Sequence, residues 1–316
     1  MHRIIYNTYN ANNYNRAKID VLILADYEDD RALSLLTKLN EKGVEISYII
    51  ALNYIGAEEI DKLSLFPYIV NCMTASQITA LPVGNNPKEF VARLNNINTE
   101  IGLSDKNIIV DISCMHIPEI FTLLKFLKMK CDDISIEVAY SFPFDYNFPQ
   151  EPFTSFSSYD GDLQVKEMPG FSGSSERAEF KKFIVFFGFE GLLTKKVVED
   201  ATNNQLLLVN SFPSYYLKYK DISIINNYDL VHRLNGKIAY VPADNPFEVY
   251  NFLEKELNES SESYCVAPLS TKLVALGVCL YALKKGNVRV VYPVPEAYNL
   301  HKTNQSTNTV IYTVKL

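Results

Sequence analysis

Residues 21–52, VLILADYEDDRALSLLTKLNEKGVEISYIIAL, decide the fold class of this 316-residue chain. An apolar strand leads into an acidic turn, an amphipathic helical pattern that ends at Gly43, and a second apolar strand. Two adjacent strands can run parallel only when a crossover such as this helix connects them. The stretch therefore predicts a βαβ unit within an α/β protein whose sheet is mainly parallel.

The same order of elements returns in the second half of the chain. Residues 181–212, KKFIVFFGFEGLLTKKVVEDATNNQLLLVNSF, again read as strand, turn with an acidic residue, helix and strand. Two later helices share one start signal, Asn86-Pro87-x-Glu89 and Asn245-Pro246-x-Glu248. In each, a capping Asn precedes a Pro in the first turn and a Glu three residues on. The repeated order predicts a duplication.

A second repeated motif supports this interpretation. The octets YSFPFDYN at 140–147 and YPVPEAYN at 292–299 share Tyr, Pro, Tyr and Asn at the same spacing, 152 residues apart, whereas Asn86 and Asn245 lie 159 residues apart. Loop insertions and deletions account for so small a difference. We therefore predict two duplicated Rossmann-like halves, each a mainly parallel sheet flanked by helices. The alternative is that any two α/β halves share a βαβ rhythm.

Length and local composition suggest the boundaries of these halves. A chain of 316 residues is long enough for two packed cores. Residues 149–179 are rich in Pro, Ser, Gly and Phe and follow no period of 2 or 3.6, which is typical of a linker or a lid. We expect an N-terminal lobe at 1–148, this linker or lid segment at 149–179, and a C-terminal lobe at 180–316.

The charge and the cysteines narrow the classes of ligand. A formal net charge of −7 argues against a long nucleic acid as partner, because such ligands need a basic surface. A small anionic ligand stays open, since a few backbone N–H groups and one Lys or Arg can bind it. The five Cys are scattered without zinc-ligand spacing, so no metal site is predicted. No apolar run is long enough for a membrane span, and we expect a cytoplasmic protein.

Ligands of parallel α/β sheets bind beyond the carboxyl ends of the strands, where turns lead into helices. Four such turns stand out in the sequence, and the repeat pairs the first with the third and the second with the fourth. They are Asp26–Asp29, Asp111–His116, Gly188–Gly191 and Pro268–Lys272.

The turn before the last predicted helix is the strongest candidate for an anion site. Ser270 and Thr271 offer hydroxyl and backbone N–H groups at the positive end of the helix dipole, and Lys272 adds a charge. The turn lacks the glycines of GxxxxGK[ST], so a nucleoside triphosphatase is not supported. The alternative is that the Ser merely caps the helix and that Lys272 is a solvated surface residue.

The matching turn of the first half carries Asp111, Ser113 and His116. The Asp could accept a hydrogen bond from a ribose hydroxyl or a base edge, and the His could act as acid or base near neutral pH. The alternative is a strand end that closes with an Asp-Ser turn. Cys114 and His116, two residues apart, seldom meet in attack geometry, so a cysteine nucleophile is disfavoured.

The remaining candidates are less specific. Gly188 would permit close approach to a ligand, and Glu190 could be a base or a ligand-orienting carboxylate, although GFEG does not match the dinucleotide fingerprint GxGxxG. Tyr292 and Tyr298 of the second octet could stack on a base, with Asn299 supplying an amide. The alternative is that these Tyr residues close the core at a strand end.

In its strand-turn-helix segments the chain resembles CARF-type Rossmann domains and the SAVED module, which is similar to two CARF-like halves in tandem. CARF domains have a Thr-Gly-Gly-Thr-Lys-like turn before a late helix. Residues 268–272, PLSTK, keep its Thr-Lys and lack both glycines, and the turn at 111–116 keeps neither feature. The resemblance implies binding of a cyclic or linear oligonucleotide second messenger in prokaryotic antiviral defence. Such modules are usually attached to an effector domain, and none is visible here. The resemblance therefore implies a stand-alone sensor, an enzyme that degrades the messenger, or a subunit that works with a separately encoded effector.

Three hypotheses follow, and the sequence identifies no cofactor. The first is a nucleotide-binding regulatory protein, whose partner is an anionic small molecule or oligonucleotide and which could form a homo-oligomer. The second is an enzyme that acts on nucleotides or phosphorylated small molecules. The third is a non-catalytic scaffold subunit of a multiprotein complex. Fold alone does not choose among them.

Overall fold

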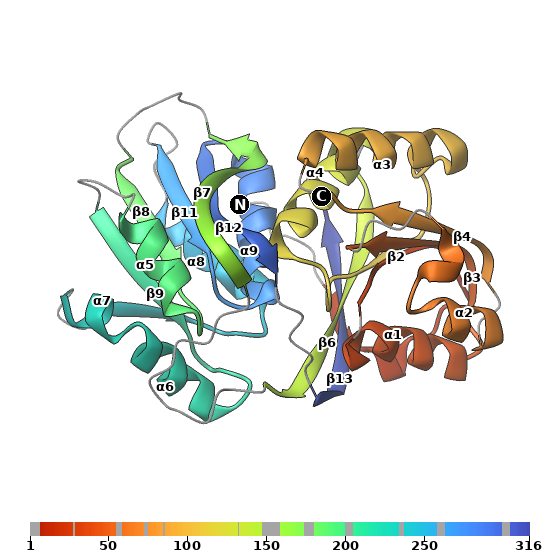
Figure 1. Cartoon of the computed structure of the whole chain (residues 1–316), viewed down its shortest axis with the longest axis horizontal. Helices are drawn as coiled ribbons and strands as arrows, with labels where there is room; N and C mark the ends of the chain where they lie inside the picture. The colour runs from red at the N-terminus through yellow and green to blue at the C-terminus, as the bar shows by residue number, and fades with distance from the viewer. Residues whose placement is uncertain are drawn as a thin grey trace. The chain divides into compact units, whose positions relative to one another are not determined.

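The structure, a computed structural model, describes residues 7–27, 29–54, 59–72, 75–84, 86–131, 133–146, 159–173, 180–199, 205–233, 237–257, 263–298 and 304–316. The chain forms two compact units, which Figure 1 shows as two α/β bodies. Unit 1 comprises Met1–Asn147 and Lys302–Leu316, and unit 2 comprises Phe148–His301.

Unit 1 is built on a seven-stranded sheet with the order β1-β13-β6-β5-β2-β3-β4. From β2 to β6 the strands are parallel, while β13 runs antiparallel to β6 and β1 antiparallel to β13. The strands are β1 Asn7–Asn10, β2 Lys18–Asp26, β3 Glu45–Asn53, β4 Ala75–Pro82, β5 Ile108–Asp111, β6 Ser135–Asp145 and β13 Asn304–Lys315. The helices are α1 Asp30–Glu41, α2 Phe66–Cys72, α3 Pro87–Ile101 and α4 Ile117–Lys130, with 3-10 turns η1 Ala11–Asn13 and η2 Ile60–Lys62.

Unit 2 is built on a six-stranded sheet with the order β10-β9-β8-β11-β12-β7. From β8 to β12 the strands are parallel, and β7 runs antiparallel to β12. The strands are β7 Tyr159–Ser172, β8 Lys182–Phe186, β9 Gln205–Ser211, β10 Ile238–Val241, β11 Tyr264–Pro268 and β12 Val288–Tyr298. The helices are α5 Gly191–Glu199, α6 Leu217–Asn226, α7 Tyr228–Arg233, α8 Pro246–Glu256 and α9 Lys272–Lys285.

The two units share one topology. When the five parallel strands of each are numbered along the chain, both sheets read 3-2-1-4-5, which is a Rossmann-type order. The fold class predicted from the sequence is therefore confirmed. The predicted βαβ stretch is β2, α1 and β3, and its counterpart in unit 2 is β8, α5 and β9.

The repeated Asn-Pro helix starts are also confirmed. Asn86 caps α3 by accepting from the Lys88 N–H at 3.1 Å, and Asn245 caps α8 by accepting from the N–H groups of Phe247 and Glu248. In α3 the Glu of the motif bonds the capping side chain itself, because Asn86 Nδ2 donates to Glu89 Oε1 at 2.9 Å. Each cap satisfies N–H groups that the first helical turn leaves without a partner.

The helix that follows the fourth parallel strand is buried in unit 2. Ten of the fourteen residues of α9 are buried, so the helix is apolar on all sides. Gly277 lies where α9 meets α8. A Cβ at this position would come within 2.4 Å of the Pro246 carbonyl oxygen and within 2.6 Å of Val249 Cβ. The glycine thus allows the two helices to approach closely.

The outer antiparallel strands are exchanged between the two halves of the repeat. β7 follows β6 in the chain but pairs with β12, and β13 follows β12 but pairs with β6. The predicted boundaries are corrected accordingly, because residues 304–315 complete the sheet of unit 1 rather than that of a lobe at 180–316. Within the predicted linker or lid at 149–179, residues 159–172 form β7 of the second sheet. Residues 149–158 and 174–179 lie outside the described residues.

The exchange also explains the repeated octets. β5 pairs with β6 as far as Ala139 and β11 pairs with β12 as far as Val290, whereas the antiparallel partners continue to Asp145 and Tyr298. Each octet therefore begins where the parallel partner of its strand has ended. From there on, the exchanged antiparallel strand is the only partner that the structure describes. Register shifts accompany the prolines, next to Pro143 in one unit and Pro295 in the other. A proline has no N–H to donate to a ladder and is tolerated at strand edges and bulges.

Candidate functional site

Each sheet has one point at which the strand order reverses, and the predicted turns meet there. This point lies between β2 and β5 in unit 1 and between β8 and β11 in unit 2. In unit 2 the approach is close, because a Cβ on Gly188 would lie 2.6 Å from the Leu269 carbonyl oxygen. Ligands of this fold class bind at such switch points. The first and second of the four turns therefore follow neighbouring strands of unit 1, and the third and fourth follow neighbouring strands of unit 2.

The switch point of unit 2 carries a pair of hydroxyls. Ser270 Oγ lies 2.8 Å from Ser211 Oγ, which comes from the carboxyl end of β9. Thr271 has a structural role, since its hydroxyl accepts from the Val274 N–H and donates to the Ala243 carbonyl. It is therefore Thr271, and not Ser270, that caps α9. Lys272 is the first residue of α9 and is half-buried.

The GFEG turn packs against its own chain. Asn226 and Asn227 donate from their side-chain amides to the carbonyls of Phe189 and Gly188, at 2.7 and 2.9 Å. The Glu190 carbonyl accepts from the Thr194 N–H at the start of α5. The close approach that Gly188 permits is thus made to the backbone at Leu269, and the suggested approach of a ligand stays a prediction.

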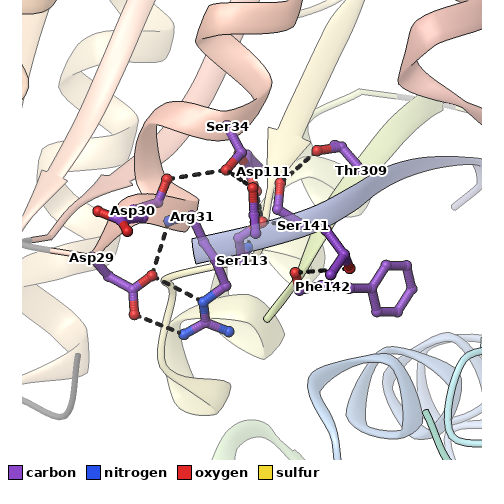
Figure 2. A network of polar contacts seen from close by, with 11 residues as sticks. Asp29, Asp30, Arg31, Ser34, Asp111, Ser113, Ser141, Phe142 and Thr309 are labelled. Atoms are coloured by element: carbon purple, nitrogen blue, oxygen red, sulfur yellow. Dashed lines mark hydrogen bonds and ion pairs between the residues drawn. The ribbon is translucent and has the colours of Figure 1, made fainter. Parts of the chain in front are cut away.

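In unit 1, Asp111 and Ser113 anchor a buried polar network, which Figure 2 shows from close by. The Asp111 carboxylate accepts from both the N–H and the hydroxyl of Ser113, and that hydroxyl accepts from the Ser141 N–H at 2.8 Å. The hydroxyls of Ser141 and Thr309 lie 2.8 Å apart, and Lys38 Nζ donates to Thr309 at 3.1 Å. The network joins β5, β6 and the exchanged strand β13. Its geometry fits the Asp-Ser turn that was the alternative to a ligand-binding Asp111.

Arg31 is a site residue that the sequence did not indicate. Its Nε and Nη2 donate to the two carboxylate oxygens of Asp29 at 3.0 and 3.1 Å, and both side chains are almost fully buried (Figure 2). Nη1 donates to none of the residues that the structure describes. Burial opposes the charge of the guanidinium, but Cys114, Tyr140 and Asp29 outweigh it and hold the pKa of Arg31 above its ordinary value. The cation is therefore permanent.

An aromatic cluster lies at the same edge of the sheet. It is formed by Tyr27, Tyr54 and His116, which directly follow β2, directly follow β3 and directly precede α4. The rings of Tyr54 and His116 have centroids 4.1 Å apart, and Tyr27 lies edge-on to both at 6.1 Å. The Tyr54 hydroxyl accepts from the His116 N–H at 3.0 Å. Burial raises the pKa of Tyr27 to about 12, so its phenol is neutral.

Two tyrosines of the octets lie in the core. Tyr140 is fully buried and packs edge-on against Phe142, with ring centroids 4.9 Å apart, and Tyr292 is also buried at 9% exposed. For these two residues the core interpretation is the better one. The Tyr298 side chain and the whole of Asn299 lie outside the described part of the chain.

Two further features bear on the chemistry of the described residues. Among them, no group of three His, Cys, Asp or Glu side chains lies close enough together to hold a metal ion. The search for membrane spans found no described helix with the length and apolar character needed to cross a bilayer.

Comparison with known proteins identifies no family. No family model matches the chain, and no curated protein matches it. Among solved structures it is similar to a functionally unknown protein from Pseudomonas aeruginosa PAO1, with 10% identity and a TM-score of 0.24. It is also similar to a putative universal stress protein from Pseudomonas aeruginosa UCBPP-PA14, with 11% identity and a TM-score of 0.25. Both alignments cover 86% of this chain and 92% of the other. Scores this low carry no argument about activity.

Proposed function

We propose that this protein binds a nucleotide or oligonucleotide second messenger and acts as a regulatory sensor, with the ligand at the switch point of unit 1. The observation that carries the proposal is Arg31, a buried and permanent cation whose Nη1 donates to no described residue. Asp29 fixes the guanidinium plane through two hydrogen bonds. A phosphate oxygen is the acceptor that such a fixed guanidinium favours.

The aromatic cluster suggests the second half of the ligand. Tyr27, Tyr54 and His116 are half-buried. Burial raises the pKa of Tyr27, and Asp29 and Arg31 are near enough for their charges to act on that pKa as well. Stacking of a base on an aromatic side chain is worth about 1–3 kcal/mol and tolerates any base. In this proposal Arg31 binds a phosphate group of the ligand, and the aromatic cluster stacks on its base.

Two features favour a sensor over an enzyme. The Asp111 carboxylate is engaged in a buried turn, and Cys114 is buried at 5% exposed, so neither is presented as a base or nucleophile. The role in antiviral defence and the separate effector rest on the resemblance to CARF and SAVED modules, whereas the expected cytoplasmic location comes from the sequence, which holds no long apolar run. The Ser211–Ser270 hydroxyl pair beside Lys272 is the corresponding candidate phosphate contact in unit 2.

A thermal-shift screen with nucleoside monophosphates, dinucleotides, cyclic oligonucleotides and sugar phosphates tests the proposal. A ligand at a hundredfold excess over its Kd stabilises the folded state by about 2.7 kcal/mol, which is roughly 5–10 °C for a unit of this size. The test variant is Asp29→Asn with Arg31→Gln, which removes the cation without leaving a buried charge. It should abolish the shift, and Lys272→Ala reports separately on unit 2.

The matched control is Lys18→Gln with Glu45→Gln, a charge-neutral change at an exposed ion pair of unit 1 whose Nζ and Oε1 atoms lie 3.9 Å apart. This variant should keep the full shift. Chromatography of the incubated nucleotide distinguishes the enzyme hypothesis, which predicts turnover. If no compound shifts the wild-type protein, the scaffold hypothesis replaces this one.

A further inference from the structure

Unit 2 exposes large apolar side chains, and two of them lie at its β10 edge. Among the described residues, seven of the ten exposed large hydrophobic side chains lie between Leu192 and Tyr240. Two of them, Phe212 and Tyr240, are 44% and 46% exposed and pack edge to face with ring centroids 6.2 Å apart. The aromatic pair is thus an exposed apolar contact at the β10 edge, and exposed apolar patches are typical of interaction surfaces.

The backbone at this edge is open for pairing. In the described structure β10 pairs with β9 alone and ends the sheet. The Val241 carbonyl accepts from the Phe212 N–H at 2.7 Å, so Val241 faces inward to β9. Because successive residues of a strand face opposite sides, the N–H and C=O groups of Ile238 and Tyr240 face outward. An edge of this kind is a template for another strand.

Within the strand itself, β10 lacks the side chains that usually protect an edge, although it is only four residues long. Natural edges are shielded by charged residues, prolines or bulges, but Ile238–Val241 contains neither a charge nor a proline. The corresponding edge strand of unit 1, β4, differs. Its described side chains, Gln77–Pro82, include no exposed large hydrophobic group. Two units of one topology therefore present different edges, and the difference favours a role specific to unit 2.

The charge around this edge favours a second copy of the chain as the occupant. Residues 212–244 hold four Lys or Arg and three Asp, a formal charge of +1, so the rest of the chain carries −8. Two copies of so acidic a protein repel each other on most approaches. Residues 212–244, which include β10, are nearly neutral, so two copies can approach each other there with little repulsion. Lys237 precedes the strand and Asp244 follows it.

We propose that two copies of this chain pair through β10, with the strands antiparallel about a two-fold axis at Tyr240. Most soluble homo-oligomers are two-fold dimers whose contact uses the same surface on both chains. Tyr240 and the partner's Tyr240 exchange both N–H···O bonds, which sets their Cα atoms about 5.5 Å apart. The exposed Tyr240 and Phe212 rings of both copies then cover one another. Pro242, which has no N–H, ends the pairing just past the strand.

Light scattering coupled to size-exclusion chromatography, run over a hundredfold range of concentration, tests the proposal. The chain has a mass of 36.0 kDa, and the wild-type protein should approach twice that mass as the concentration rises. Tyr240→Asp should keep it monomeric, since it places two carboxylates opposite each other at the axis. Phe144→Asp is the matched control, because Phe144 is a 56% exposed aromatic residue of a strand in unit 1. It should leave the dimer intact.

Cross-linking tests the position of the axis. A Cα separation of about 5.5 Å lies within the range that a disulfide spans, so Tyr240→Cys should form a covalent dimer under mild oxidation. Met129→Cys, at a position 70% exposed in unit 1, should not. Three results would overturn the proposal: a wild-type protein that stays monomeric, a dimer that survives Tyr240→Asp, or equal cross-linking at both positions. A monomeric wild type would leave the edge to another protein or to nucleic acid.

Discussion

Replacing Gly277 by alanine sets two known effects against each other. Alanine in place of glycine inside a helix normally stabilises by about 1 kcal/mol. Here the new Cβ would lie 2.6 Å from Val249 Cβ and 2.4 Å from the Pro246 carbonyl oxygen. Unbonded carbon atoms pack best at about 3.5–4.0 Å, so α8 and α9 must separate by roughly 1 Å. Neither neighbouring atom is the end of a flexible side chain.

The steric effect should win. Overpacking a core costs about 1–3 kcal/mol, and a clash with backbone belongs in the upper part of that range. We expect Gly277→Ala to lower the free energy of unfolding by about 1 kcal/mol or more. Urea unfolding followed by circular dichroism measures the change. Gly84→Ala is the control, because no atom of the described residues lies within 4 Å of a Cβ there, and it should be neutral or slightly stabilising. A Gly277→Ala protein as stable as the wild type would refute the reasoning.

Three other predictions concern single groups. Thr271→Ala should cost about 1 kcal/mol by removing the cap of α9, while Thr271→Ser should keep most of it, as urea unfolding will report. Burial raises the pKa of Tyr27 from 10.0 to about 12. The contribution of its neutral phenol to the free energy of unfolding is therefore complete below pH 10 and is lost as the pH rises to 12. Ultraviolet titration of the wild type and of Tyr27→Phe checks this. Burial raises the pKa of Cys265 to about 12, so this thiol should resist alkylation at pH 8 until the protein is unfolded, as peptide mass mapping can show.

The sequence predicted the parallel core of both units because its signals are local. Each signal depends only on residues that are close by in the sequence. These signals are the continuous apolar runs of the strands, the helix stop at Gly43 and the Asn caps at 86 and 245. The exchanged strands gave no comparable signal. Residues 304–309 are all polar and residues 310–315 are mostly apolar, and nothing near them indicates that β6, some 160–180 residues earlier, is the partner. Pairing over such distances is decided by tertiary packing.

The candidate site was predicted in part. The turns at Asp111–His116 and Pro268–Lys272 do lie at the switch points, since that follows from strand order. Arg31 was missed because an Arg two residues after an Asp in an acidic turn looks like a solvated charge, and its burial depends on strands remote in sequence. Thr271 rather than Ser270 proved to be the cap, a difference of one residue that backbone angles decide. Tyr140 lies in the core because its strand continues past the parallel sheet.

The exchange of outer strands has a consequence for the order in which the protein can be completed during synthesis. The ribosome makes β1 before the other strands, yet β1 pairs with β13. The pairing of Asn7 with Thr313 can therefore form only after β13 has been made. Unit 2 has all its strands once β12 has emerged, while unit 1 still lacks its seventh strand. The half that is begun first is therefore finished second. Until then β6 offers an open edge to the chaperones and to other nascent chains.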